Sequence, residues 1–378
     1  ERMTLAVPPA HLEAFLALAA RREVEATVLG TYTDTGLFHV LHAGHTVALL
    51  DMAFLHHGVP EMHLQAHWQP PSHPEPTFAC PADLTASLLQ MLGRLNICSK
   101  EWVIRQYDHE VQGRSVIKPL VGQDNDGPSD AAVLRPLLDS MEGVVVANGI
   151  CPRYSDIDTY HMAACAIDEA VRNAIAVGGR LDHMAGLDNF CWPDPVLSPG
   201  TPDGPYKLAQ LVRANQALYD YCTAYGVPCI SGKDSMKNDY HVGDTKISVP
   251  PTLLFSVLAR LPDVRRAVTM DVKRPGDLVF MLGETRAELG ASEYYALHGA
   301  VGNRVPQVDA PRARQLYEAL GQAIECGLVN ACHDCSDGGF GVAAAEMASV
   351  CSLTCAPRRA SPISPVTTPC STPKRPVV

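Results

Sequence analysis

The sequence lacks any run of 18 uninterrupted apolar residues, and its first residues, Glu1, Arg2 and Met3, lack the basic, apolar and small-residue sections of a signal peptide. This pattern indicates a cytoplasmic protein with no membrane partner. Basic residues are also few: 30 Lys and Arg stand against 41 Asp and Glu, a formal net charge of -11, and no basic run is interleaved with aromatic residues. The sequence therefore predicts no nucleic-acid partner.

A disulfide framework is missing as well. The 13 cysteines are an odd number scattered along the chain, many in apolar surroundings such as Cys165 and Cys222, which is typical of reduced thiols. One zinc-like spacing remains as an alternative, C-x2-C-x15-C-x3-C, formed by Cys332, Cys335, Cys351 and Cys355. Its first pair flanks a glycine-rich acidic turn and its second pair borders a low-complexity tail, so we favour reduced thiols.

What is present is an ordinary globular composition, with 47% hydrophobic and 19% charged residues in 378. This length predicts two or three domains. Because the first residue is Glu1 and not Met, we expect a piece of a longer chain. Five prolines between Pro70 and Pro81 predict an extended linker. From Ala356 to Val378 there are six prolines, six Ser or Thr, four basic residues and no acid, which predicts disorder.

Hydrophobic periodicity predicts the order of helices and strands. Before the linker we expect a helix over 8–22 and strands over 26–29, 37–41 and 46–50, with Gly30 and Gly36 bracketing the first hairpin. The histidines that follow are expected to lie on the surface, namely His56, His57, His63 and His67. After the linker we expect helices over 84–93, 158–177, 205–225, 312–325 and 341–350, and strands over 102–107, 115–121, 144–148, 183–187, 246–259 and 277–282, with one more strand after residue 325. This order predicts an α+β fold with layered helices.

The predicted helix over 158–177 carries a polar patch although it is apolar nearly all round. Glu169 and Asn173 are four residues apart, so their oxygens lie one turn apart and can share a hard cation. The alternative is an exposed edge with an Asp168–Arg172 ion pair. Both interpretations stay open at this point.

Three loops have the composition of phosphate or metal sites. SGKDSMKN (231–238) combines Gly232, Lys233 and Ser235, but its glycine spacing is not that of a Walker A loop. HDCSDGGFG (333–341) places acids before paired glycines that lead into a helix. DNDGPSDAAVL (124–134) is a third acidic turn, with too few ligands for an EF-hand. Each loop alone is consistent with a plain turn.

Taken together, six strings resemble phosphoribosylformylglycinamidine synthase in its large single-chain form: SKEWVIRQYDHEVQG (99–113), GPSDAAVLRP (127–136), DEAVRNAIAVGG (168–179), LDNFCWPDP (187–195), ISGKDSMKND (230–239) and HDCSDGGFG (333–341). The resemblance covers about residues 1–350. It implies aminoimidazole-ribonucleotide-synthetase-like domains with mixed sheets and layered helices. The implied reaction is the ATP- and glutamine-dependent conversion of formylglycinamide ribonucleotide to the amidine in purine biosynthesis, catalysed by a ligase.

The resemblance also implies a domain order. It assigns 1–67 to the end of a first C-terminal domain, 68–83 to a Pro-rich linker, 84–300 to a second N-terminal domain, 301–352 to the truncated start of its partner, and 353–378 to a disordered tail. The family's catalytic histidine and its glutaminase are not found in these 378 residues, so we expect the chain alone to be inactive. We also expect the half-domain at 301–350 to fold poorly, because it lacks the rest of its sheet.

Residue roles follow from the resemblance position by position. Magnesium ligands are implied at Asp130, Glu169, Asn173 and Asp334, which would hold ATP or ADP with Mg²⁺. Nucleotide contacts are implied at Lys100, Ser129 and Ser336. A second group would reach a catalytic site across a pseudo-twofold axis: Asp188, Gly232 and Lys233 toward ATP, and Ser235 toward the substrate. A catalytically inactive nucleotide-binding or interaction fragment is the rival interpretation, and association with full-length copies stays open.

Overall fold

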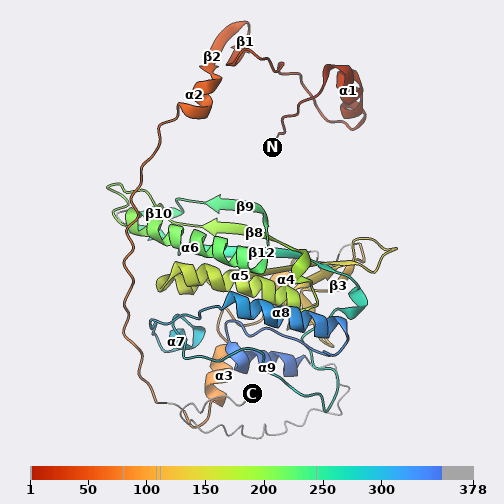
Figure 1. Ribbon diagram of the computed structural model, residues 1–378, viewed down its shortest axis with the longest axis vertical. Coiled ribbons are helices and arrows are strands. Elements are labelled where there is room, and N and C mark those ends of the chain that lie inside the picture. The colour runs from red at the N-terminus through yellow and green to blue at the C-terminus, as the bar shows by residue number, and fades with distance from the viewer. Residues whose placement is uncertain (1, 80, 108, 111, 244, 351–378) are drawn as a thin grey trace. The chain divides into compact units, whose positions relative to one another are not determined.

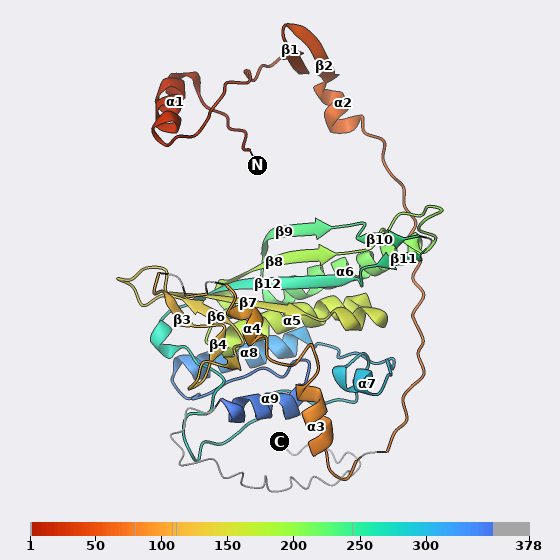
Figure 2. The ribbon, with the colours of Figure 1, turned by 180° about the vertical axis from the view of Figure 1, so that it is seen from behind.

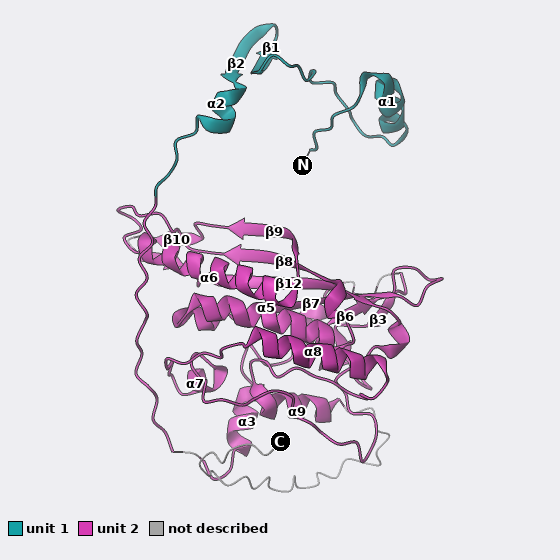
Figure 3. Cartoon of the chain, in the orientation of Figure 1, with its two compact units in different colours: residues 1–63 teal, residues 64–378 magenta. Residues whose placement is uncertain are grey.

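The computed structural model describes residues 2–79, 81–107, 109–110, 112–243 and 245–350. The chain divides into two compact units, Glu1–His63 and Leu64–Val378 (Figure 3). The predicted disordered tail at 353–378 lies outside the described residues, as does the second cysteine pair of the zinc-like spacing. No helix in the described ranges is long and apolar enough to cross a membrane.

The first unit is a short helix followed by a hairpin and a second short helix. Its elements are η1 (Pro9–His11), α1 (Leu12–Arg21), β1 (Leu37–His42), β2 (His45–Asp51) and α2 (Met52–His57). The hairpin turns at Ala43 and Gly44, both with positive φ, and not at the predicted glycines; the strand predicted over 26–29 is absent. Ala19 is the one buried side chain among this unit's described residues, so the unit encloses almost no core. The four expected surface histidines are exposed.

The second unit is built on a six-stranded sheet in the order β3-β6-β7-β12-β8-β9 (Figures 1 and 2). Neighbouring strands are antiparallel except β8 and β9, which are parallel, so the sheet is mixed as expected. Alternate side chains of β12 are buried, as one helix-covered face requires. The strands are β3 (Ser115–Ile117), β6 (Ala132–Leu134), β7 (Gly143–Ile150), β8 (Met184–Cys191), β9 (Cys229–Ser235) and β12 (Thr252–Leu261).

Helices α5 (Thr159–Ala176) and α6 (Gly204–Tyr225) cover one face of this sheet. Thirteen of the 18 residues of α5 are buried, many of them alanine, which lets the helix approach the strands closely. At Gly149 of β7, a Cβ atom would lie 2.1 Å from the carbonyl oxygen of Ala166, so only glycine allows this approach. Helix α5 is thus held between the sheet and the next helix layer.

That outer layer is α8 (Ala310–Glu325), which packs on α5 and α6. Tyr317 and Ile324 of α8 are 5% and 2% exposed, so they belong to the core of the second unit. The reason for expecting this segment to fold poorly, an unburied apolar face, therefore does not hold for α8. Its apolar face is buried by two helices of the preceding region, and a further sheet is not needed. The prediction of layered helices is confirmed.

Shorter elements surround this framework. They are α3 (Thr85–Leu92), α4 (Glu101–Ile104), β4 (Leu120–Val121), β5 (Gly127–Pro128), η2 (Pro152–Asp156), η3 (Leu181–His183), β10 (Asp239–Val242), β11 (Thr245–Ser248), η4 (Val264–Arg266), α7 (Glu293–Leu297) and α9 (Gly339–Ser349). The strand predicted over 246–259 is split into β11 and β12 at Pro250 and Pro251, which cannot donate to a ladder.

Three predicted strands are not strands. The strand predicted over 102–107 is replaced by the short helix α4, in which Glu101 pairs with Arg105 one turn later; just before it, the Ser99 hydroxyl accepts the Glu101 N–H at 3.2 Å. Residues 277–282 form no regular structure, and their apolar side chains are exposed without a neighbouring strand in the described chain. The segment after residue 325 is likewise irregular.

The described part of the Pro-rich segment preceding α3 forms no helix or strand. It packs against the rest of the second unit through aromatic contacts and hydrogen bonds. Trp68 stacks on Tyr206 with ring centroids 5.6 Å apart, and the Arg213 guanidinium lies 4.5 Å from the Trp68 ring. Further along, the amide of Asn303 donates to the His73 carbonyl at 2.6 Å, and Phe78 stacks on His298 at 4.6 Å. We call residues 64–79 the strap.

Candidate functional site

Two loops that are distant in sequence meet at Asp130 and Asp334. Asp130 lies between β5 and β6, and Asp334 precedes α9. The Asp334 backbone N–H donates to Asp130 Oδ1 at 3.0 Å. His333 joins them, so that one ligand atom from each of these three residues lies within 4.8 Å of the other two. The structure thus brings two of the predicted metal ligands together.

Histidine 333 was not among the predicted site residues, although it stands inside the quoted HDCSDGGFG string. Its Nδ1 lies 2.8 Å from Asp130 Oδ1, and its Nε2 lies 3.0 Å from Glu346 Oε2. Burial alone lowers the pKa of His333, but the hydrogen bonds to Asp130 and Glu346 outweigh it and raise the pKa to about 10. The imidazolium is therefore charged at neutral pH and holds the Asp130 carboxylate in place.

The predicted pair on α5 faces the end of β7. Glu169 Oε2 accepts the Ile150 N–H at 2.8 Å, and the Asn173 amide donates to the Asn148 carbonyl at 3.1 Å. Burial raises the pKa of Glu169 to about 7, opposed by Arg172 and reinforced by the charge of Asp334. The charge of Asp334 thus acts on Glu169, although Glu169 lies outside the 4.8 Å group.

Arginine 172 connects this cluster to the helix core. Its guanidinium pairs with Asp168 one turn earlier on α5 and donates to Asp334 Oδ2 at 3.3 Å. Asp168 is only 6% exposed, and its Oδ1 also accepts the hydroxyls of Tyr225 at 2.5 Å and Tyr317 at 2.7 Å. The Asp168–Arg172 ion pair of the alternative interpretation is present, but Asp168 is buried and Arg172 is partly buried, so the pair does not form an exposed edge.

The oxygens around Asp130 suit a hard divalent cation. Hydrogen bonds in the described chain use one oxygen each of Asp130, Glu169 and Asp334, which leaves the second oxygen of every carboxylate available. Asn173 Oδ1 is buried and has no hydrogen-bond partner. Burial raises the pKa of Asp334, which Arg172 opposes and Asp130 reinforces. Clustered carboxylates with an orphaned amide oxygen fit Mg²⁺, which prefers oxygen ligands.

Two of the three predicted nucleotide contacts are close in sequence to this cluster, and the third, Lys100, lies on another element. Ser129 precedes Asp130, and its hydroxyl donates to the Ala131 carbonyl at 2.9 Å. Ser336 is exposed two residues after Asp334. Lys100 stands at the start of α4, and its Nζ donates to the Cys98 carbonyl at 2.5 Å. No interaction described here commits Ser336 or the remaining donors of Lys100 to the protein interior.

The second predicted group lies on β8 and β9, at the other side of the sheet. Asp188 of β8 is directly opposite Gly232 of β9, and Lys233 and Ser235 follow on β9. A Cβ atom at Gly232 would lie 2.4 Å from Asp188 Oδ1, so the glycine admits the carboxylate. Burial raises the pKa of Asp188. Asp188 lies on β8 and Glu169 contacts the end of β7, with β12 between these two strands, so the second group lies on other strands than those that border the Asp130 cluster.

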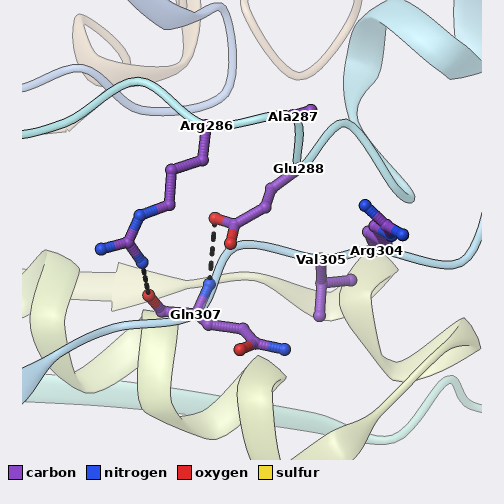
Figure 4. A pocket seen from close by; sticks show the side chains of 6 residues that line it. All are labelled: Arg286, Ala287, Glu288, Arg304, Val305 and Gln307. Carbon is purple, nitrogen blue, oxygen red and sulfur yellow. Dashed lines mark hydrogen bonds between the residues drawn. The ribbon is translucent and has the colours of Figure 1, made fainter. Parts of the chain in front are cut away.

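A pocket of about 350 Å³ lies elsewhere in the second unit and contains none of the predicted site residues (Figure 4). Arg286 donates to the Gln307 carbonyl at 3.5 Å, and the Gln307 N–H donates to Glu288 Oε2 at 3.3 Å. Ala287, Arg304 and Val305 complete its lining. These hydrogen bonds connect the segment 286–288 to the segment 304–307 around the pocket.

Comparison with known proteins gives consistent matches. The model of the AIR synthase related protein N-terminal domain matches residues 128–249, and that of the C-terminal domain matches residues 274–356. The phosphoribosylformylglycinamidine synthase subunit PurL of Methanocaldococcus jannaschii is 33% identical over 92% of this chain and 46% of its own length. The subunit of the same name from Methanothermobacter marburgensis is 34% identical over 92% of this chain and 46% of its own length.

The chain thus spans about half the length of the curated relatives it matches. A solved structure described as T. maritima PurL complexed with ADP aligns with a TM-score of 0.47 at 21% identity, over 70% of this chain and 38% of that one. The two domain models of one family fall in order along the second unit. The chain belongs to the AIR synthase related protein family and is a relative of the phosphoribosylformylglycinamidine synthase subunit PurL.

Proposed function

We propose that this chain is part of a phosphoribosylformylglycinamidine synthase, in which it holds a magnesium-nucleotide complex and supplies one edge of the catalytic site. The relatives that match 92% of the chain carry that name. The observation that carries the proposal is the orphaned, buried Oδ1 of Asn173, which lies one helical turn from Glu169 on α5. An unpaired buried amide oxygen is costly unless a ligand satisfies it.

In this proposal Asp130, Glu169, Asn173 and Asp334 hold Mg²⁺, which neutralises phosphate oxygens of ATP or ADP when it is bound. Arg172 and His333 orient two of these carboxylates through the hydrogen bonds described above. The nucleotide contacts are assigned to Lys100, Ser129 and Ser336. Ser336 lies just before α9, whose N-terminal N–H groups favour an anion.

The residues of β8 and β9 have a different role in the proposal. Asp188, Gly232 and Lys233 contact ATP, and Ser235 contacts formylglycinamide ribonucleotide, in a catalytic site completed by the other half of the synthetase. Support comes from their position on β8 and β9, while the Asp130 cluster borders β6 and β7, and from the exposure of β9 at the sheet edge. A lysine supplies a fixed positive charge, so Lys233 neutralises phosphate there without binding a metal. Glutamine-derived ammonia would come from a glutaminase that these residues do not include.

A thermal-shift titration tests the magnesium-nucleotide site. Mg²⁺ with ADP at about one hundred times its dissociation constant adds roughly 2.7 kcal/mol to the free energy of unfolding. We expect Glu169→Gln to abolish most of this gain. The matched control, Glu318→Gln on the exposed side of α8, keeps it. An unchanged melting temperature of the wild-type chain with saturating Mg²⁺ and ADP would contradict the site.

A turnover assay separates the synthase from the rival interpretation. With formylglycinamide ribonucleotide, ATP and ammonia, we expect no amidine from this chain alone, because the family's catalytic histidine belongs to the first half. Complementation with that half should restore product, and Ser235→Ala should lower the turnover of the complemented enzyme while Mg²⁺-ADP binding stays intact. Binding without turnover after complementation would favour a nucleotide-binding fragment.

A further inference from the structure

Two cysteine sulfurs face each other where α6 meets β9. The Sγ atoms of Cys222 and Cys229 are 3.9 Å apart. In the described part of the chain, no other two cysteine sulfurs are in contact. A disulfide has an S–S length of about 2.05 Å, so the sulfurs must approach by roughly 1.9 Å. Cys229 is exposed, so rotation of its side chain can provide this movement.

Small molecules can reach this pair. A surface pocket of about 600 Å³ is lined by both cysteines together with Leu218, Tyr219, Val227 and Pro228. Burial raises the pKa of both thiols, and the hydrogen bond between them raises that of Cys222 while it lowers that of Cys229. Cys229 is the more exposed of the two thiols and meets a dissolved oxidant first, and Cys222 lies next to it as a second nucleophile.

We propose that Cys222 and Cys229 form a reversible disulfide by exchange with a low-molecular-weight disulfide. The Cys229 thiolate attacks one sulfur of the oxidant, forms a mixed disulfide and expels one thiolate. The Cys222 thiolate then attacks Cys229 Sγ and expels the second. Two electrons pass from the cysteine pair to the oxidant, and the two thiol protons end on the two released thiols, so the exchange balances.

The disulfide would link the first residue of β9, the edge strand that carries Gly232 and Ser235, to the end of α6. Cys222 lies in the last turn of α6, and Cys229 is the first residue of β9. Strand β9 has a single neighbour in the sheet, β8, and its residues are largely exposed. A covalent tie between helix and strand limits local opening of β9 in a way that hydrogen bonds to β8 alone do not. The proposal is independent of the reaction assigned to the chain.

The test is incubation of the full chain with oxidised glutathione, followed by alkylation of free thiols and peptide mapping. We expect a peptide linking Cys222 to Cys229, loss of two free thiols per chain and full recovery of both on addition of dithiothreitol. In Cys222→Ser the glutathione adduct on Cys229 should persist, because the resolving thiol is missing. Cys326→Ser, which removes an exposed cysteine with no sulfur neighbour among the described residues, should leave the linked peptide unchanged.

Amide hydrogen exchange measures whether the disulfide limits local opening of β9. Amides in 229–235 should exchange at least several-fold more slowly in the oxidised wild type than in the reduced form, and Cys229→Ser should show no such difference under the same treatment. A stable glutathione adduct on wild-type Cys229 with no linked peptide would overturn the proposal. A linked peptide without slower exchange in 229–235 would overturn its effect on β9.

Discussion

Replacing Asp168 by asparagine should destabilise the second unit more than any comparable substitution of a surface acid. The Asp168 side chain is buried and accepts hydrogen bonds from Arg172, Tyr225 and Tyr317. Its loss removes one of the two carboxylates that pair with the partly buried Arg172, whose Nε is buried without a hydrogen-bond partner. Removing one member of a buried ion pair typically costs about 3–5 kcal/mol. We expect a loss in this range, since the amide keeps the shape but not the charge.

Urea unfolding monitored by tryptophan fluorescence measures this loss. Trp192 is fully buried and its Nε1 donates to the Lys207 carbonyl at 3.0 Å, so its emission reports on the core of the second unit. The matched control is Asp182→Asn, which breaks an exposed pair with Arg180 and should cost less than about 1 kcal/mol. Equal midpoints for Asp168→Asn and Asp182→Asn would refute the reasoning, because burial would then add nothing to the ion pair.

Three further predictions concern other parts of the second unit. Gly232→Ala should lower the free energy of unfolding by about 1–3 kcal/mol, because the new Cβ meets the Asp188 carboxylate. Urea unfolding of the wild type, the two single variants and the double variant should show that most of this loss disappears when Asp188→Ala is also present. The pKa of His333 in the folded protein, about 10, exceeds its usual value of 6.5, so the stabilisation by the charged imidazolium is complete below about pH 6.5 and is lost as the pH rises toward 10. His333→Gln should therefore flatten the dependence of the free energy of unfolding on pH in this range, and an unchanged slope would contradict the charged imidazolium. Trp68→Ala should make proteolytic cleavage of the strap roughly tenfold faster, since loss of the Tyr206 and Arg213 contacts removes about 1.4 kcal/mol; equal cleavage rates would show that the ring does not fasten the strap.

The long helices could be predicted from the sequence because their signals are local. Helix α5 begins after Asp158, whose side chain accepts the Tyr160 N–H, and ends before Gly178, which has a positive φ. Strand prediction was less reliable, because a short apolar run does not reveal its partners. Residues 277–282 have a strand-like composition but no neighbouring strand in the described chain, whereas β9, with its Gly-Lys-Asp sequence, is a strand because β8 pairs with it.

The candidate site could be predicted only in part. Spacing on one helix relates Glu169 to Asn173, and the family resemblance adds Asp130 and Asp334. Neither the spacing nor the resemblance reveals that the His333 ring lies between the carboxylates of Asp130 and Glu346. Glu346 lies on the following helix, and Asp130 lies some 200 positions earlier. The burial of Asp168 could not be foreseen either, since Tyr317 reaches it from the segment expected to fold poorly.

The packing of α8 also limits how this chain can be divided. The two family models meet between residues 249 and 274, yet Tyr317, from beyond that junction, donates to Asp168, from before it. A protein ending near residue 300 would uncover the outer sides of α5 and α6 and deprive a buried carboxylate of one donor. A recombinant protein meant to contain the domain predicted over 84–300 should therefore extend to the end of α8. The two domains can be told apart in the sequence, but the first is not expected to fold well without a helix of the second.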